Sequence, residues 1–305
     1  MAKVESLGNL VSVITKNSKF MIFDNNNVLT NAGLNNPNKI NITENGTYYL
    51  VNNLDSNYSN SDIDIELVIN EGINASIVEL IKTEKDITLS RNINLKENSE
   101  LNIITIYESS TNKTVIKAKT VLEKGAYLNS KSLSLFMGEV ESLYDENLTG
   151  EKAKIEGYNV FINNSKTKQN FDLNTYHNVK ETESMVRNFA ICKGESVLNI
   201  NTNGIVLNGS KQSNISQKTK GILLSQESGI SANPLLQIDE FDCLASHGAG
   251  IGAIDEEDLF YLMSRGLTKL ESEKLIIGGF VNPIYEAISN EDLRNIILNK
   301  VSKYL

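Results

Sequence analysis

The sequence predicts an all-β protein, with a parallel β-helix core followed by a small C-terminal α-helical unit. The first observation is a turn with glycine or asparagine that recurs every 25 to 27 residues. The second is that apolar residues recur with the turn, as expected when rungs stack in register. The third is a change after residue 254, where helix caps replace the strand pattern. We therefore divide the chain into a short segment 1–20, a β-helix core 21–254 and a helical unit 255–305.

The repeat is clearest between residues 46 and 150. Its turns are separated by 26, 26, 27 and 25 residues and fall at Gly46, Gly72, Asn98, Gly125 and Gly150. Four apolar residues of one repeat stand 26 positions before four of the next: Ala75, Ile77, Val78 and Leu80 before Leu101, Ile103, Ile104 and Ile106. An antiparallel β-sandwich with evenly spaced turns is the alternative that this pattern leaves open.

The C-terminal unit begins with two helix signals. Asp255 can cap a helix that runs to Arg265 and stops at Gly266. Thr268 and Glu271 have the spacing of a capping box, which predicts the start of a second helix.

Further helices are expected toward the C-terminus. The second helix should end near Gly278, because Pro283 suits the first turn of a third helix. A fourth is indicated by helical spacing of Leu293, Ile296, Ile297 and Val301. A short helix is also expected within residues 1–20.

Composition excludes several classes of protein. The 305 residues carry a net charge of -9, which argues against a nucleic-acid partner because phosphate binding requires clustered Lys and Arg. The sequence has neither an 18-residue apolar span nor a secretory signal, so we expect no membrane association. Two cysteines 51 residues apart make no disulfide framework and fit a reducing compartment. We expect a cytoplasmic protein.

Residues 243–266 hold the strongest candidate for a site. If this segment starts as a strand, Cys243, Ala245 and His247 point to the same face. Thiolate and imidazole are ligand types of iron-sulfur chemistry. The alternative is a small core cysteine near a surface histidine. No Walker A sequence is present, so any ATP dependence must come from a partner.

The motifs of this segment resemble those of the SufB/SufD family, the scaffold proteins of the SUF iron-sulfur cluster assembly system. Family members carry Ser-His-Gly-Ala, Asp-Glu-Glu, Leu-Phe-Tyr-Leu and Ser-Arg-Gly in this order. The chain has the same motifs at Ser246–Ala249, Asp255–Glu257, Leu259–Leu262 and Ser264–Gly266. Further residues upstream also look like family motifs: Gln217, Ile222–Ser225, Asn233-Pro234 and Ile238. The clear resemblance covers residues 210–290.

The resemblance implies a right-handed parallel β-helix and a non-catalytic scaffold. It implies two partners: a SufC-like ABC ATPase and a second SufB/SufD-like protomer, either a copy of this chain or a paralogue. The ATPase would dock on the C-terminal helices, where the matching residues are Leu259, Phe260, Tyr261 and Arg265. Residues 20–29 resemble the strand that opens the family core, after a helical region that is mostly missing here.

The same resemblance makes His247 the first candidate ligand of a transient iron-sulfur cluster. The chain departs from the family at Ala245, where SufD members have cysteine, and at Gly248, where SufB members have glutamate. Cys243 is our hypothesis for the substitute thiolate. It stands four residues from His247, about 13 Å along an extended strand, so each would meet ligands from a second protomer. That protomer is expected to associate through strands near residues 235–247.

Two other residues have competing interpretations. Cys192 is a candidate metal ligand, although a small core residue is its simpler interpretation. His177 looks like a family histidine, but a hydrogen-bonded structural histidine is the default for it. Two other functions remain open: a structural SUF partner that holds no cluster, and a β-helix carbohydrate-active enzyme.

Overall fold

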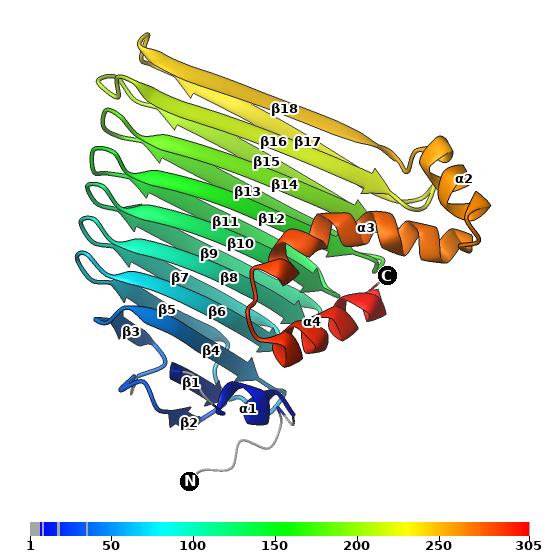
Figure 1. Ribbon diagram of the computed structural model, residues 1–305, viewed down its shortest axis with the longest axis horizontal. Coiled ribbons are helices and arrows are strands. Elements are labelled where there is room, and N and C mark those ends of the chain that lie inside the picture. The colour runs from blue at the N-terminus through cyan, green and yellow to red at the C-terminus, as the bar shows by residue number, and fades with distance from the viewer. Residues whose placement is uncertain (1–6, 8, 17–18, 35, 305) are drawn as a thin grey trace.

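The protein is a flattened β-solenoid in which two parallel sheets face each other (Figure 1). The computed structural model describes residues 7, 9–16, 19–34 and 36–304, so part of the expected segment 1–20 lies outside the described residues. Each coil uses one strand from each sheet, and the coils stack from the N-terminal end to β18. Among the described helices, none is long and apolar enough to cross a membrane.

The larger sheet has ten strands, in the order β18-β16-β14-β12-β10-β8-β6-β4-β1-β2. Their bounds are β1 (Lys19–Asp24), β2 (Asn27–Thr30), β4 (Gly46–Leu54), β6 (Asn74–Thr83), β8 (Glu100–Ser109), β10 (Tyr127–Phe136), β12 (Lys154–Asn163), β14 (Glu183–Cys192), β16 (Ser213–Leu223) and β18 (Cys243–Ala253). The smaller sheet has eight strands, in the order β17-β15-β13-β11-β9-β7-β5-β3. Their bounds are β3 (Lys39–Ile42), β5 (Asp62–Ile69), β7 (Ile87–Leu95), β9 (Lys113–Leu122), β11 (Glu139–Leu148), β13 (Lys168–His177), β15 (Val197–Val206) and β17 (Gly229–Ile238).

The register confirms the apolar repeat. Ala75, Ile77, Val78 and Leu80 of β6 pair with the residues 26 positions later in β8, as the sequence predicts. The stacked strands are parallel, which excludes the antiparallel sandwich. Alternate side chains of both sheets point into the lumen and form two buried clusters of Ile, Leu, Val and aromatic residues.

The turns on one side of the solenoid share a left-handed residue. Positive φ angles stack from coil to coil at Gly72, Asn98, Gly125, Lys152, Glu181 and Gln212. The predicted repeat is therefore out of register at Gly150, because Lys152 takes the left-handed position in that turn. It is also out of register at Gly46, which begins β4 and pairs with Ala75, three residues after Gly72. Gly150 has a different role: a Cβ there would stand 1.9 Å from the backbone nitrogen of Lys124. Glycine allows the two coils to approach closely.

The sequence predicts one strand over residues 20–29. The structure instead forms a hairpin there. β1 and β2 pair antiparallel, and the chain turns at Asn25, which has a positive φ. β1 also pairs in parallel with β4, so it starts the larger sheet.

Within the described residues, four helices lie outside the solenoid: α1 (Asn9–Ile14), α2 (Glu256–Ser264), α3 (Lys269–Glu286) and α4 (Glu291–Tyr304). Figure 1 shows α3 and α4 across the outer face of the larger sheet. Their apolar residues Ile277, Val281, Ile284 and Ile297 are buried in one cluster with strand residues of that face. The helical unit is thus fixed to the β-solenoid by hydrophobic burial.

The predicted caps of α2 and α3 are present. Asp255 accepts a hydrogen bond from the Glu257 backbone (2.8 Å), and Thr268 and Glu271 complete a capping box. The predicted break before Pro283 is wrong, since α3 continues through it. Buried residues on both sides of the proline hold the helix to the sheet, which offsets the lost backbone hydrogen bond.

The close approach at Gly150 gives a stability test. Gly150→Ala should destabilise the fold by about 1–3 kcal/mol, because the new methyl group meets backbone atoms that cannot move independently. Gly278→Ala is the matched control: it lies inside α3, meets nothing within 4 Å, and should stabilise the helix by up to about 1 kcal/mol. Thermal unfolding followed by circular dichroism measures both. Equal melting temperatures for the two variants would contradict the close approach.

Candidate functional site

The candidate residues Cys243 and His247 lie on β18, the last strand of the larger sheet. Cys243 pairs with Ser213 of β16 and His247 pairs with Gln217, both of which are buried and face the lumen. Paired residues of parallel strands point to the same side, so Cys243 and His247 also face inward. This agrees with the sequence prediction of a shared face. His247 is nevertheless exposed and Cys243 half-buried, since no further coil of the described chain covers this surface.

The inner surface of the last coil, which β17 and β18 form, is mainly apolar. On β17 the inward residues include Leu236 and Ile238, because their partners on β15 are Gly204 and Val206. On β18 they include Ala249 and Ile251. Ile238 is 37 % exposed and Ile251 is 41 % exposed, whereas equivalent positions in earlier coils are buried. We call this surface the open coil.

The structure separates the three predicted metal ligands. Cys243 and His247 are four residues apart on one continuous strand, about 13 Å between Cα atoms. Cys192 aligns with Leu223 and, through it, with Ala253. Ala253 is ten residues from Cys243, so Cys192 and Cys243 are separated by roughly 33 Å along the strand direction. One protomer therefore cannot bring two of these three residues to one iron atom.

Both thiols are protonated at neutral pH. Cys192 is fully buried, its Sγ donates to the Gly229 carbonyl (3.4 Å), and burial raises its pKa to about 11. Cys243 donates to the Glu240 carbonyl (3.2 Å). Partial burial raises its pKa, and the charges of Glu240 and Asp242 add to this effect. Iron would have to displace the thiol proton, since thiolate is the binding form.

His177 is structural, as the sequence analysis expected by default. It is fully buried, and its two ring nitrogens contact the hydroxyls of Thr182 and Ser184, each at 2.8 Å. Burial lowers its pKa to about 4, so the ring is neutral. In the part of the chain that the structure describes, no group of three or more His, Cys, Asp and Glu residues could hold a metal ion.

The sequence does not predict the contacts of Gln217, the residue that pairs with His247 on the neighbouring strand. Gln217 reaches across the lumen: its amide donates to the Thr202 carbonyl (3.2 Å) and accepts from the Gly204 N–H (2.9 Å). A Cβ on Gly204 would lie 2.8 Å from the Gln217 amide. A larger residue at Gly204 would crowd the side chains of Ile215, Gln217 and Leu236, and Gln217 ties the two sheets together next to the open coil. The resemblance to the family includes Gln217, but only the register of the strands reveals which backbone groups it contacts.

A polar column runs through the lumen one row along from Gln217, since it ends at Thr219 of the same strand. The residues in register from β6 to β16 are Glu79, Thr105, Ser132, Asn159, Asn188 and Thr219. Neighbouring members are joined by hydrogen bonds, such as Asn159 to Asn188 (3.0 Å). At its base, the buried pair Glu79 and Arg91 meets at 2.5 Å.

A cavity of about 70 Å³ adjoins this column and is lined by Arg91, Tyr144 and Glu146. The Nε of Arg91 is buried without a hydrogen-bond partner, and Glu146 accepts a hydrogen bond from Thr175 (3.1 Å). Burial raises the pKa of Glu146 from 4.5 to about 7. The partial exposure of Glu146 is toward this cavity, which is large enough for a few water molecules.

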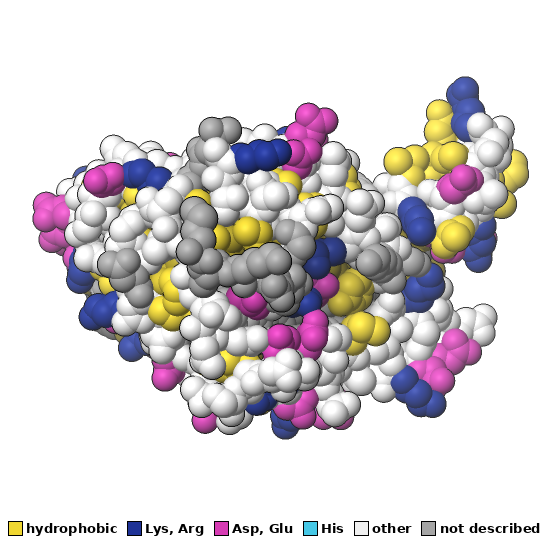
Figure 2. Space-filling model, turned by 90° about the horizontal axis from the view of Figure 1, so that it is seen from below, with side chains coloured by type: hydrophobic (Ala, Val, Ile, Leu, Met, Phe, Trp, Pro, Cys, Tyr) yellow, Lys and Arg dark blue, Asp and Glu magenta, His cyan; other side chains and the backbone are white. Residues whose placement is uncertain are grey.

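The predicted partner-binding residues gather on α2. Phe260 is 74 % exposed and Tyr261 is 57 % exposed, while Leu259 is half-buried. Arg265 lies over the Tyr261 ring, 5.3 Å from its centroid. None of the residues of α2 is buried. In Figure 2, the lobe at the right that corresponds to α2 and the start of α3 stands away from the body and carries hydrophobic side chains.

Comparison with known proteins supports one family. Residues 53–280 match the family described as SUF system FeS cluster assembly, SufBD core domain. The chain is similar to the iron-sulfur cluster assembly protein SufD of Bacillus subtilis, with 29 % identity over 166 residues, which cover 54 % of this chain and 38 % of that protein. It is also similar to SufD of Escherichia coli, with 33 % identity over 84 residues, 28 % of this chain and 20 % of that protein.

SufD of Plasmodium falciparum is 26 % identical over 190 residues, 60 % of this chain and 13 % of that protein. The chain thus spans less than two fifths of the length of each of these curated relatives. The family match extends well to the N-terminal side of residues 210–290, where the resemblance is readable in the sequence.

Glu146 gives a prediction about pH. Its folded-state pKa is raised, so its neutral form supports the fold below about pH 4.5, and this contribution is lost as the pH rises through about 7. Glu146→Gln keeps the acceptor for Thr175 and should be more stable than wild type at pH 8, by up to about 3 kcal/mol. Urea unfolding at pH 5 and pH 8 measures the difference. The exposed Glu139→Gln on the same strand is the control, and an equal pH dependence in both variants would contradict the assignment.

Proposed function

Because this chain belongs to the SufBD core family of the SUF system, we propose that it is a scaffold subunit for iron-sulfur cluster assembly. The chain itself would be non-catalytic and the cluster a transient cargo. The observation that carries the proposal is the open coil, which presents His247 and Cys243 on an inner surface that the chain leaves exposed. A site that must receive iron and sulfur and then release a cluster has to be accessible in this way.

The proposal requires a second SufB/SufD-like protomer. A cluster usually takes about four protein ligands, whereas one chain offers His247 and Cys243 about 13 Å apart. A two-fold arrangement of open coils would double the number of ligand residues and bring His247 of one protomer near Cys243 of its partner. The same contact would cover the unpaired edge of β18 and the apolar residues Ile238 and Ile251. The partner would be a copy of this chain or a paralogue.

We also propose that a SufC-like ABC ATPase docks on α2. The exposed Phe260 and Tyr261 supply apolar contact area of the type that forms the centre of interfaces. α2 contacts α3, which is buried against the larger sheet through Ile277, Val281 and Ile284. A displacement of α2 by the ATPase would thus reach the sheet that ends in β18. In this picture the motion opens the protomer interface to iron and sulfur.

A structural SUF partner that holds no cluster is the second candidate. Ala245 in place of the family cysteine favours it, and so does the raised pKa of Cys243. Membership of the SufBD family leaves the carbohydrate-active enzyme without support. The proposed location is the cytoplasm, where thiols stay reduced.

The scaffold role predicts a loss of cluster assembly on His247→Ala. The variant should fold and bind the ATPase as wild type does, because the His247 side chain is exposed and does not lie on α2, yet accumulate at least tenfold less cluster. Cys243→Ser should reduce cluster formation less completely if an external thiol compensates. Anaerobic reconstitution with iron and sulfide, with the ATPase present and followed by absorbance and Mössbauer spectra, measures this.

Ser246→Ala is the control, because Ser246 is next to His247 but points to the opposite face of β18. Full cluster assembly by His247→Ala would refute the ligand role. If wild type with all partners also assembles no cluster, the structural-partner function replaces the scaffold function.

The docking role predicts that Phe260→Ala or Tyr261→Ala weakens capture of the ATPase at least tenfold, since each removes an exposed aromatic anchor. Both should leave the fold intact, because α2 has no buried residue. Met137→Ala, at a residue 50 % exposed elsewhere, is the matched control. Titration of labelled ATPase against each purified variant measures the affinity. Wild-type affinity in both aromatic variants would exclude α2 as the docking site.

A further inference from the structure

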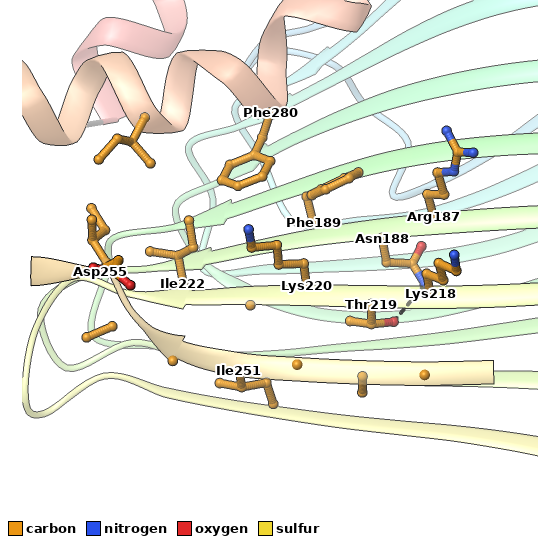
Figure 3. Close-up of a pocket in the computed structure, with 18 of the residues that line it drawn as sticks. Arg187, Asn188, Phe189, Lys218, Thr219, Lys220, Ile222, Ile251, Asp255 and Phe280 are labelled. Atoms are coloured by element: carbon orange, nitrogen blue, oxygen red, sulfur yellow. Dashed lines mark hydrogen bonds between the residues drawn. The ribbon is translucent and has the colours of Figure 1, made fainter. Parts of the chain in front are cut away.

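A groove lies between the outer face of the larger sheet and α3, behind the open coil. Its volume is about 730 Å³. β14, β16 and β18 form its floor, and Phe280 and Ile276 of α3 form one wall. Figure 3 shows Phe280 extending from α3 toward Phe189 and Lys220, with Ile251 on the opposite side of β18. The side chains of Arg187, Lys218, Lys220 and Phe280 lie on the outer side of the sheet, although His247, Ala249 and Ile251 of β18 also line the cavity.

Three cations line one half of this groove. Arg187 of β14 and Lys218 of β16 are neighbours in register, and Lys220 lies two residues further on the same face. Such neighbours are roughly 5 and 7 Å apart between Cα atoms. None of the three makes an ion pair within the described residues: Arg187 contacts the Met185 sulfur (3.3 Å), and Lys220 lies over the Phe280 ring at 5.1 Å. Unpaired cations in a groove of a protein with net charge -9 point to an anionic ligand.

The β18 part of the groove floor lacks outward side chains, although no packing contact requires glycine there. Gly248, Gly250 and Gly252 all point outward from β18, since their partners are Lys218, Lys220 and Ile222. A Cβ added to any of them meets nothing within 4 Å, and none has a left-handed φ. Glycine weakens a strand and marks places where a ligand approaches the backbone closely. The open space above these glycines is the place for such a ligand.

The other surfaces of the groove indicate what kind of anion fits. Phe280 stacks on Phe189 (5.0 Å between centroids), and with Ile222 and Ile276 it makes an apolar wall. Asp255 and Asp258 stand at the end away from the cations and could accept hydrogen bonds. We propose that the groove binds a phosphorylated organic molecule of nucleotide size, with its phosphates on Arg187, Lys218 and Lys220 and its flat body against Phe280.

A small molecule fits better than an acidic peptide. The volume lies within the range of small-molecule sites, about 300–1,000 Å³. An acidic segment lying along the groove would place carboxylates beside Asp255 and Asp258 at the far end, where like charges repel. The cations are confined to one half of the groove, as a ligand with one multiply charged group requires. The proposal does not depend on cluster assembly, because none of its ligand-binding residues faces the open coil.

Isothermal titration of the purified full chain with ADP, and separately with pyrophosphate, tests the proposal. ADP should bind with a dissociation constant below about 1 mM, and at least tenfold more tightly than pyrophosphate. Gly250→Val should weaken ADP binding at least tenfold by filling the floor, while melting no lower than wild type, because valine suits a strand. Lys218→Ala/Lys220→Ala should weaken it by a similar factor.

Lys117→Ala/Lys119→Ala is the matched control, since these two lysines have the same spacing on the outer face of the smaller sheet. It should bind ADP as wild type does. Absence of saturable ADP binding would overturn the proposal, and so would ADP binding that Gly250→Val and the Lys218/Lys220 variant leave unchanged. Pyrophosphate binding as tight as that of ADP would also overturn it, because the organic body would then contribute nothing.

Discussion

Parallel stacking of coils is the constraint on which the rest of the structure depends. Each coil covers the edge and the inner side chains of the coil before it, so every strand between the two ends of each sheet is paired on both sides. The last coil, β17 with β18, has no such neighbour in the described chain. Its apolar inner residues and unpaired edge thus leave a surface that needs a partner. His247 lies in the middle of this surface.

The same constraint explains why the sequence predicted the core well. In-register stacking requires that apolar positions repeat with the coil, and Ala75 with Leu101 shows this directly. The Gly150 error shows the limit of the repeat: several residue types can occupy the left-handed position of a turn, and Lys152 does so here. The Pro283 error has another cause, since burial of Ile277 and Ile284 on the sheet outweighs the local preference of proline.

The sequence predicts the face of the strand on which Cys243 and His247 lie, but not the contacts of the residues that pack next to them. Alternation along a strand is local, so the shared face of Cys243 and His247 could be read from the sequence alone. The contact between Gln217 and Gly204 depends on the register of both sheets. The separation of Cys192 from Cys243 depends on it too, because 51 residues of sequence correspond to opposite ends of the stacked strands.

The central claim is that the open coil is completed by a second protomer, and sedimentation velocity tests it most directly. Particles purified from native cells should contain two SufB/SufD-like protomers, and so should the chain alone at rising concentration if the partner is a second copy. Ile238→Glu/Ile251→Glu places charges on the open coil and should reduce the assembly to one protomer. A wild-type particle with a single protomer under both conditions would contradict the account.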